Sequence, residues 1–262
     1  MAKVNNMTRN AHAKRFIQEV FADILLSEGF VCPDDKLICW YRFVNKEIVN
    51  SICFYTPWPN LPLMVSIGYG IHPLFTLPAR IPSVYAPNRP TDMETFRHQG
   101  LIPNPDIGHI HMNMYSSDAQ VYAPEGGFGI YTLEGALLPT MDKVRTIEEC
   151  YQMHKQKYLS QAMIPAEHRF GAASITFIDE AIYCNDTAVF PCFAPVLENR
   201  IRFYEAECEK HPTSKAVLST LRHVMQQKHA LYEGKRTEYL EYLRQQKETN
   251  LVQLTKKYGI TL

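Results

Sequence analysis

The chain has 262 residues, of which 46% are hydrophobic, and its 27 Lys and Arg balance its 27 Asp and Glu. This composition is typical of a folded globular protein and excludes the collagen-like, low-complexity and disordered classes. The balanced charge lacks the basic excess of a dedicated nucleic-acid-binding protein, so nucleic acid is not expected as a partner. No run of 18 apolar residues occurs, and a membrane-spanning helix is therefore not expected either.

Cysteine usage and the N-terminal residues bear on the compartment. The seven cysteines are an odd number and no two are spaced as C-x-x-C, so the sequence predicts neither a disulfide framework nor a cysteine zinc site. The first residues meet charged or Asn side chains before any apolar run of the length that a signal peptide needs. We therefore expect a cytoplasmic protein.

The first expected element is an amphipathic helix over residues 8–28. Phe16, Val20 and Ile24 recur at helical spacing. Gly29 follows them and is expected to cap the C-terminal end of the helix.

Three segments rich in β-branched and aromatic residues follow this helix, at 37–44, 48–55 and 63–69. The turn-prone pair Asn45 and Lys46 separates the first two segments and predicts a β-hairpin. The link to the third segment is too short for a crossover, which predicts an antiparallel meander. The expected fold class is therefore α+β, with the N-terminal helix packed on an antiparallel sheet.

A long loop is expected over residues 73–105, because this stretch holds seven prolines and each proline removes a backbone donor. Strand patterns resume at 107–115, 128–133 and 174–183.

The C-terminal part of the chain is predicted to be helical. A capping-box pattern at Thr146 starts one helix, and Pro195 marks the start of another. Two amphipathic helices are expected over 217–231 and 240–258, with Gly234 between them, and they are expected to form an antiparallel pair.

The expected organisation is an α+β domain over residues 1–190, which contains the loop, followed by a helical extension over residues 191–262. The extension is expected to pack on the domain, and it either forms a separate unit or belongs to the same domain. No internal repeat is present.

Motif searches exclude several enzyme classes. The P-loop, the dinucleotide-binding turn, the zincin helix and the nucleophile elbow are all absent from the sequence. The sequence therefore identifies no reaction.

The strongest pattern for chemistry is the pair His109 and His111. In an extended strand these residues point to the same face, where both imidazoles would reach one divalent metal ion if a carboxylate also converged on it. Asp118 is the candidate carboxylate, and Asp106 and Glu125 also lie near in sequence. The alternative is that both histidines lie on the solvated face of a sheet and bind nothing.

Aromatic residues supply the candidate ligand-binding positions. Trp40 and Tyr55 lie on predicted strands, and Tyr115 shares the predicted face of the two histidines. Such side chains would form the floor of a pocket for a small ligand, although aromatic residues on strands also form cores.

The N-terminal part resembles a known family. The sequences Gly29-Phe30, Trp40-Tyr41-Arg42 and 66–69, together with the helix pattern from Phe16, resemble the bacterial domain-of-unknown-function family 4304. The resemblance covers about residues 12–75. It implies an α+β fold and a bacterial protein, and it implies no activity, cofactor or catalytic residue.

Two functions follow as hypotheses. The first is a cytoplasmic bacterial protein that works by binding a protein or a small ligand between the sheet, the proline-rich loop and the helical tail. The alternative is a metal-dependent hydrolase in which His109 and His111 hold a divalent ion that acidifies a bound water.

Overall fold

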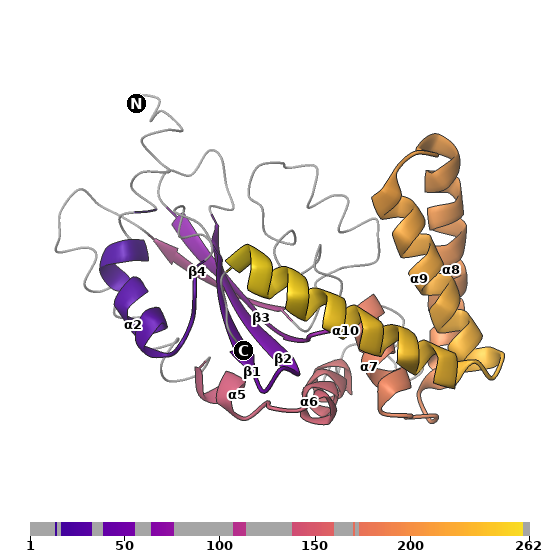
Figure 1. Cartoon of the computed structure of the whole chain (residues 1–262), viewed down its shortest axis with the longest axis horizontal. Coiled ribbons are helices and arrows are strands. Elements are labelled where there is room, and N and C mark those ends of the chain that lie inside the picture. The colour runs from indigo at the N-terminus through magenta and orange to yellow at the C-terminus, as the bar shows by residue number, and fades with distance from the viewer. Residues whose placement is uncertain are drawn as a thin grey trace. The chain divides into compact units, whose positions relative to one another are not determined.

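A computed structural model describes residue 14 and residues 17–32, 39–55, 64–75, 107–113, 138–159, 170 and 173–258 (Figure 1). The chain divides into two compact units. The first contains helix α2, strands β1 to β4, helix α5 and the last turns of helix α10, and the second contains helices α6 to α9 and the rest of α10. Among the described helices, none has both the length and the apolar character needed to cross a bilayer.

The first unit is built on an antiparallel sheet whose strands follow each other in chain order. Its strands are β1 (Cys39–Val44), β2 (Ile48–Tyr55), β3 (Met64–Pro73) and β4 (Ile107–Asn113). The turn between β1 and β2 holds Asn45 and Lys46 at φ of +52° and +56°, the left-handed region that suits a tight hairpin. The predicted hairpin and antiparallel meander are confirmed.

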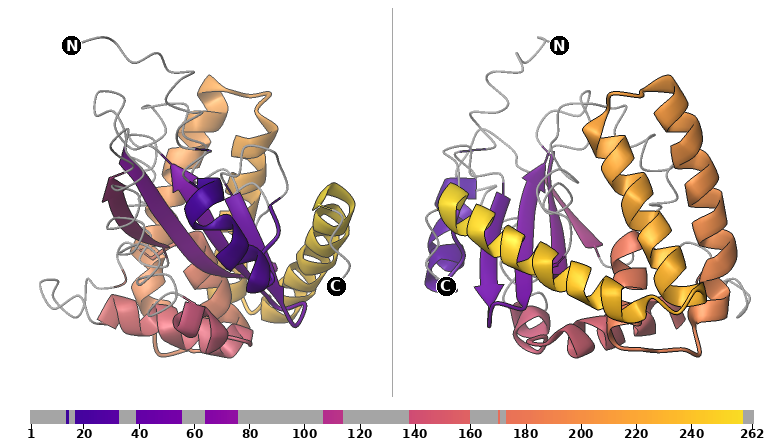
Figure 2. Two further views of the ribbon diagram at one scale, coloured as in Figure 1. Left: turned by 90° about the vertical axis from the view of Figure 1, so that its left-hand side faces the viewer. Right: turned by 45° about the vertical axis from the view of Figure 1, so that its right-hand side comes forward.

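Helix α2 (Ala22–Ser27) packs on this sheet (Figure 2). The ring of Phe21, at its N-terminal end, lies 5.2 Å from the ring of Phe54 on β2. Gly29, at φ of +78°, ends the helix, and the amide of Phe30 donates to the carbonyl of Leu25 at 2.9 Å. This left-handed glycine cap confirms the predicted end of the helix.

The core of the first unit lies beside β1 and β2, where Tyr41, Val49 and Leu74 are buried together. The Asn250 amide on α10 donates to the Leu74 carbonyl at 2.7 Å, which satisfies a backbone acceptor at the end of β3. On β1, Arg42 donates to Asp142, the last residue of α5 (Leu138–Asp142), at 2.7 Å.

The second unit is helical. Its elements are α6 (Ile147–Leu159), α7 (Ile175–Tyr183), α8 (Phe190–Lys210), α9 (Lys215–Tyr232) and α10 (Arg236–Tyr258). The start of α6 agrees with the capping pattern at Thr146. Aromatic rings join the first three of these helices: Phe177 on α7 lies 4.5 Å from Tyr158 on α6 and 6.1 Å from Phe193 on α8.

Two expectations for the helical part differ from the structure. Helix α8 begins before Pro195, which lies inside it. The antiparallel partner of α9 is α8, and α10 leaves in another direction after Gly234 (Figure 2). Helices α6 and α7 group with the later helices in the second compact unit. The domain boundary expected after residue 190 stays a prediction.

The strand predicted at 174–183 is wrong, since these residues form the capped helix α7. The Ser174 hydroxyl accepts from the amide of Phe177 at 3.0 Å and caps the helix. Residues 175–182 are all buried, so α7 needs no polar face. A short apolar run of this kind fits a buried strand or a buried helix equally well. The loop after β3 and the strand expected at 128–133 lie outside the described residues.

Candidate metal centre

The predicted metal ligands His109 and His111 lie on β4, so the extended backbone expected for them is confirmed. Their backbones are opposite Gly68 and Ser66 of β3. The structure describes the backbone of this strand but not its side chains. Asp118, the predicted carboxylate partner, lies outside the described residues, as do Asp106 and Glu125. The metal site at this strand therefore stays a prediction.

The structure describes some of the aromatic residues that were predicted to bind a ligand. Trp40 is 2% exposed and faces Ile52 of the neighbouring strand, so it belongs to the core of the first unit. Tyr55 ends β2, but its side chain is not described. Tyr115 lies outside the described residues.

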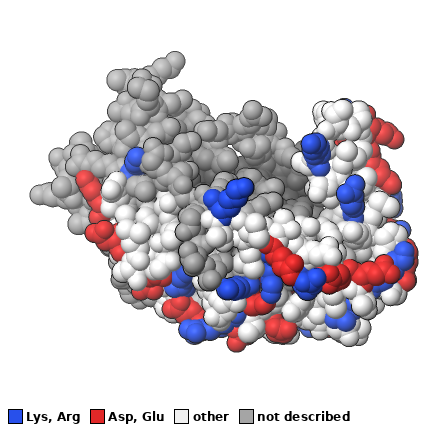
Figure 3. Space-filling view, viewed as in Figure 1, with Lys and Arg blue, Asp and Glu red and all other residues white. Residues whose placement is uncertain are grey.

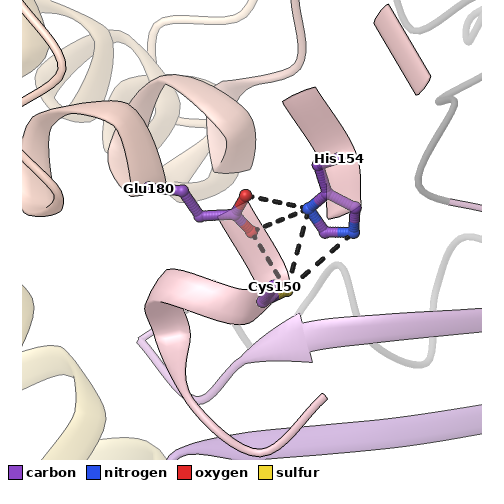
Figure 4. Close-up of side chains that lie close together, drawn as sticks. All are labelled: Cys150, His154 and Glu180. Atoms are coloured by element: carbon purple, nitrogen blue, oxygen red, sulfur yellow. Dashed lines mark hydrogen bonds and ion pairs between the residues drawn. The ribbon is translucent and has the colours of Figure 1, made fainter. Parts of the chain in front are cut away.

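A different set of metal-ligating side chains converges in the second unit, where Cys150, His154 and Glu180 meet (Figure 4). Cys150 and His154 are one turn apart on α6, and Glu180 comes from α7. The carboxylate oxygens of Glu180 lie 3.1 and 2.8 Å from His154 Nδ1. The Cys150 sulfur lies 3.6 Å from Glu180 Oε1 and 3.7 Å from His154 Nδ1.

These separations are close to those in a tetrahedral metal site. Zinc bond lengths of about 2.0–2.3 Å place neighbouring ligand atoms about 3.3–3.6 Å apart. One donor atom from each of the three side chains lies within 4.8 Å of the others. Small side-chain movements would therefore bring a thiolate, an imidazole and a carboxylate onto one ion.

The site is sealed from solvent, because Cys150, His154 and Glu180 are each 0% exposed. Burial raises the pKa of the Glu180 carboxyl well above its usual range, and the nearby Asp179 raises it further. The thiol of Cys150, which donates to Glu180, opposes this shift. Without a cation, Glu180 therefore holds its proton more firmly than an exposed glutamate does.

The preceding residue on α7 enters a second buried network on another side of the helix. The carboxylate of Asp179 lies 3.0 Å from His223 Nε2 and accepts from the hydroxyl of Tyr239 at 2.5 Å. It also accepts from the side-chain amide of Gln227. Adjacent acidic residues thus connect α7 to α6 through Glu180, and to α9 and α10 through Asp179.

Polar contacts also fix the end of α7 against α6. The Tyr151 hydroxyl donates to Asp186 at 2.7 Å, and Lys155 forms an ion pair with the same carboxylate. The hydrogen bonds from Lys155 and Tyr151 lower the pKa of Asp186 against the opposing effect of burial. Asp186 therefore remains an anion that holds the two helices in register.

Sequence reasoning missed this site. The signal was present in part, since Cys150 and His154 are four residues apart behind a capping box, and that spacing places them on one helix face. Glu180 lay in a segment predicted as a strand, so its position beside α6 was not foreseen. The cysteines show no C-x-x-C spacing, and a site shared between two helices does not require it.

Comparisons of the chain with models of protein families, with curated proteins and with solved structures found no match. The resemblance of the N-terminal part to family 4304 therefore stays a prediction.

Proposed function

We propose that this protein binds one divalent transition-metal ion of the zinc class through Cys150, His154 and Glu180. The observation that carries the proposal is the convergence of a thiol, an imidazole and a carboxyl group at one buried point between α6 and α7. These three groups are the protein ligands that zinc uses.

The donor set favours zinc over the common hard cations. Magnesium and calcium select oxygen ligands, whereas a thiol and an imidazole suit zinc and its neighbours in the transition series. The complete burial of the three side chains leaves no path for a large substrate, so the ion would act mainly by joining α6 to α7. Binding free energy gained in such a site stabilises the folded state.

Cobalt(II) tests the proposal, because a cobalt–thiolate bond gives a charge-transfer absorption band that other ligands do not. Reduced, metal-free full-length protein is titrated with cobalt, and zinc is then added in competition. We expect one ion per chain, a thiolate band, and displacement of cobalt by zinc. Zinc should also raise the melting temperature of the second unit, followed by helical circular dichroism.

Variants separate this site from the other cysteines. Cys150→Ser and His154→Ala should each weaken binding, whereas Cys192→Ser, which changes a half-buried cysteine on α8, should leave it unchanged. Equal metal binding by wild type and the Cys150→Ser/His154→Ala double variant would exclude the site.

We also propose a protein partner, which the surface of α9 favours. Leu218, Met225 and Tyr232 recur every seven residues and are 41%, 40% and 42% exposed. Lys215 and Arg222 repeat with the same period, and α9 contains no Asp or Glu. Lys and Arg side chains are visible over α9 in Figure 3. Lys215, Leu218, Arg222 and Met225 are spaced alternately by three and four residues, and Tyr232 follows one heptad after Met225. This apolar and basic surface fits an acidic amphipathic helix.

Paired synthetic peptides test this second function. One peptide has Leu at the core heptad positions and Glu elsewhere, and the other has Lys in place of Glu. Fluorescence anisotropy at physiological salt should show binding of the Glu peptide alone. Binding should be lost in Leu218→Glu/Met225→Glu and kept in Val252→Glu, which changes an exposed residue on α10. Equal binding of both peptides would contradict the proposal.

A further inference from the structure

We propose that Cys184 is the fourth ligand of the metal ion, which completes a closed site of two thiolates, one imidazole and one carboxylate. This inference rests on the proposed metal-binding function and assigns the coordination position that Cys150, His154 and Glu180 leave open.

The register between α6 and α7 places Cys184 at the level of Cys150. Contacts between the two helices follow an antiparallel order: Tyr158 meets Ser174 at 2.9 Å and His154 meets Glu180 at 2.8 Å. Tyr151, nearer the start of α6, meets Asp186 at 2.7 Å. Moving back one turn from His154 to Cys150 therefore corresponds to moving forward one turn from Glu180 to Cys184.

Helical geometry puts Cys184 on the same face of α7 as Glu180. The backbone at Cys184 is still helical, with φ of −75° and ψ of −5°, and its amide donates to the Glu180 carbonyl at 2.8 Å. Residues four apart on a helix have Cβ atoms about 5–6 Å apart. Cys150 and His154 on α6 have the same spacing, so in the proposed site each helix would supply two of the four ligands.

Cys184 is chemically suited to this role. It is half-buried and not in a disulfide. Its sulfur is not among the three donor atoms that already converge, and rotation about the Cα–Cβ bond is the movement that would bring it to the ion. Arg236 donates to the carbonyls of Ile182 and Tyr183 at 2.9 Å each, which places a positive charge at the end of α7 to offset a second thiolate.

Binding would reverse the protonation of Cys184. Burial and the acidic neighbours Glu148, Glu180 and Asp186 raise the pKa of its thiol to about 12, so the free protein holds the neutral form. A coordinating thiol is deprotonated outright. Each of the two thiols would exchange its proton for a metal–sulfur bond, and the protons would pass to the buffer.

The cobalt charge-transfer band measures how many thiolates bind the ion. We expect the band of Cys184→Ser to have about half the wild-type intensity, and zinc affinity to fall by at least roughly tenfold, since even residues that only support metal ligands contribute roughly 10–100-fold. Cys192→Ser should match wild type in both measurements. Full band intensity and full zinc affinity in Cys184→Ser would overturn the assignment.

X-ray absorption of the zinc-loaded wild-type protein gives a count that needs no variant. Two sulfur scatterers at about 2.3 Å support Cys184 as a ligand, and a single one overturns it. The latter result, with binding lost in Cys150→Ser, would leave the proposed metal-binding function intact. Failure of the wild-type protein to bind any ion would instead refute the function itself.

Discussion

The substitution Asp179→Asn tests whether the buried network on α7 holds the helical unit together. Asp179 is 2% exposed and its carboxylate accepts from His223, Gln227 and Tyr239. Asparagine keeps the shape but removes the charge and replaces one acceptor oxygen by a donor. Removing one partner of a buried, charge-assisted network lowers the free energy of unfolding by about 3–5 kcal/mol. We expect Asp179→Asn to lower the free energy of unfolding by this amount.

A graded series sharpens the test. Tyr239→Phe removes one hydrogen bond to a charged acceptor and should cost about 1.5–3 kcal/mol. In the double variant the total loss in the free energy of unfolding should be smaller than the sum of the two single losses, because Asp179→Asn already removes the negative charge that strengthens the hydrogen bond from Tyr239. Glu205→Gln, which changes an exposed residue of α8, is the control and should stay within about 0.5 kcal/mol of wild type.

Urea unfolding followed by far-ultraviolet circular dichroism measures these differences. Domain stabilities are about 5–15 kcal/mol, so the expected loss for Asp179→Asn is a large fraction of the total and will shift the midpoint clearly. The reasoning is refuted if Asp179→Asn and Tyr239→Phe both unfold within about 0.5 kcal/mol of wild type.

Three further predictions concern the metal site and two glycines. Zinc affinity should rise with pH, because burial raises the pKa of Glu180 and the ion must compete with a proton for its carboxyl group; isothermal titration at several pH values measures this, and a flat profile would contradict it. Gly29→Ala should destabilise the protein by about 1–2 kcal/mol, since it places a side chain at φ of +78°, and a wild-type midpoint in urea would exclude this. Gly70→Ala should cost about 1–3 kcal/mol in the same assay, because its Cβ would collide with the His72 ring on the same strand; an unchanged midpoint would show that the ring moves aside freely.

Local sequence signals predicted the first unit well. Asn45 and Lys46 take the left-handed conformations that close the hairpin, and Gly29 ends α2 because it lacks a Cβ. The physical causes act within a few residues, so neighbouring positions in the sequence contain the information. The same holds for the start of α6 at the capping box.

Helix α7 shows where such signals fail. Its sequence is almost wholly apolar around Asp179 and Glu180, and without a solvated face there is no periodicity to separate helix from strand. The packing of α6, α8 and α9 around it decides the structure. Buried acidic residues are tolerated there because each meets a histidine from another helix.

In the candidate site too, local spacing in the sequence predicts some features and helix packing decides the others. Spacing along the chain puts Cys150 and His154 on one helix face, and it puts His109 and His111 on one extended strand, which the backbone of β4 confirms. Sequence also determined the α+β class and the helical C-terminal part. The meeting of Cys150 and His154 with Glu180 depends on how α6 packs against α7. That packing results from long-range contacts among buried side chains, which no short window of sequence contains, so only the tertiary structure brought the three together.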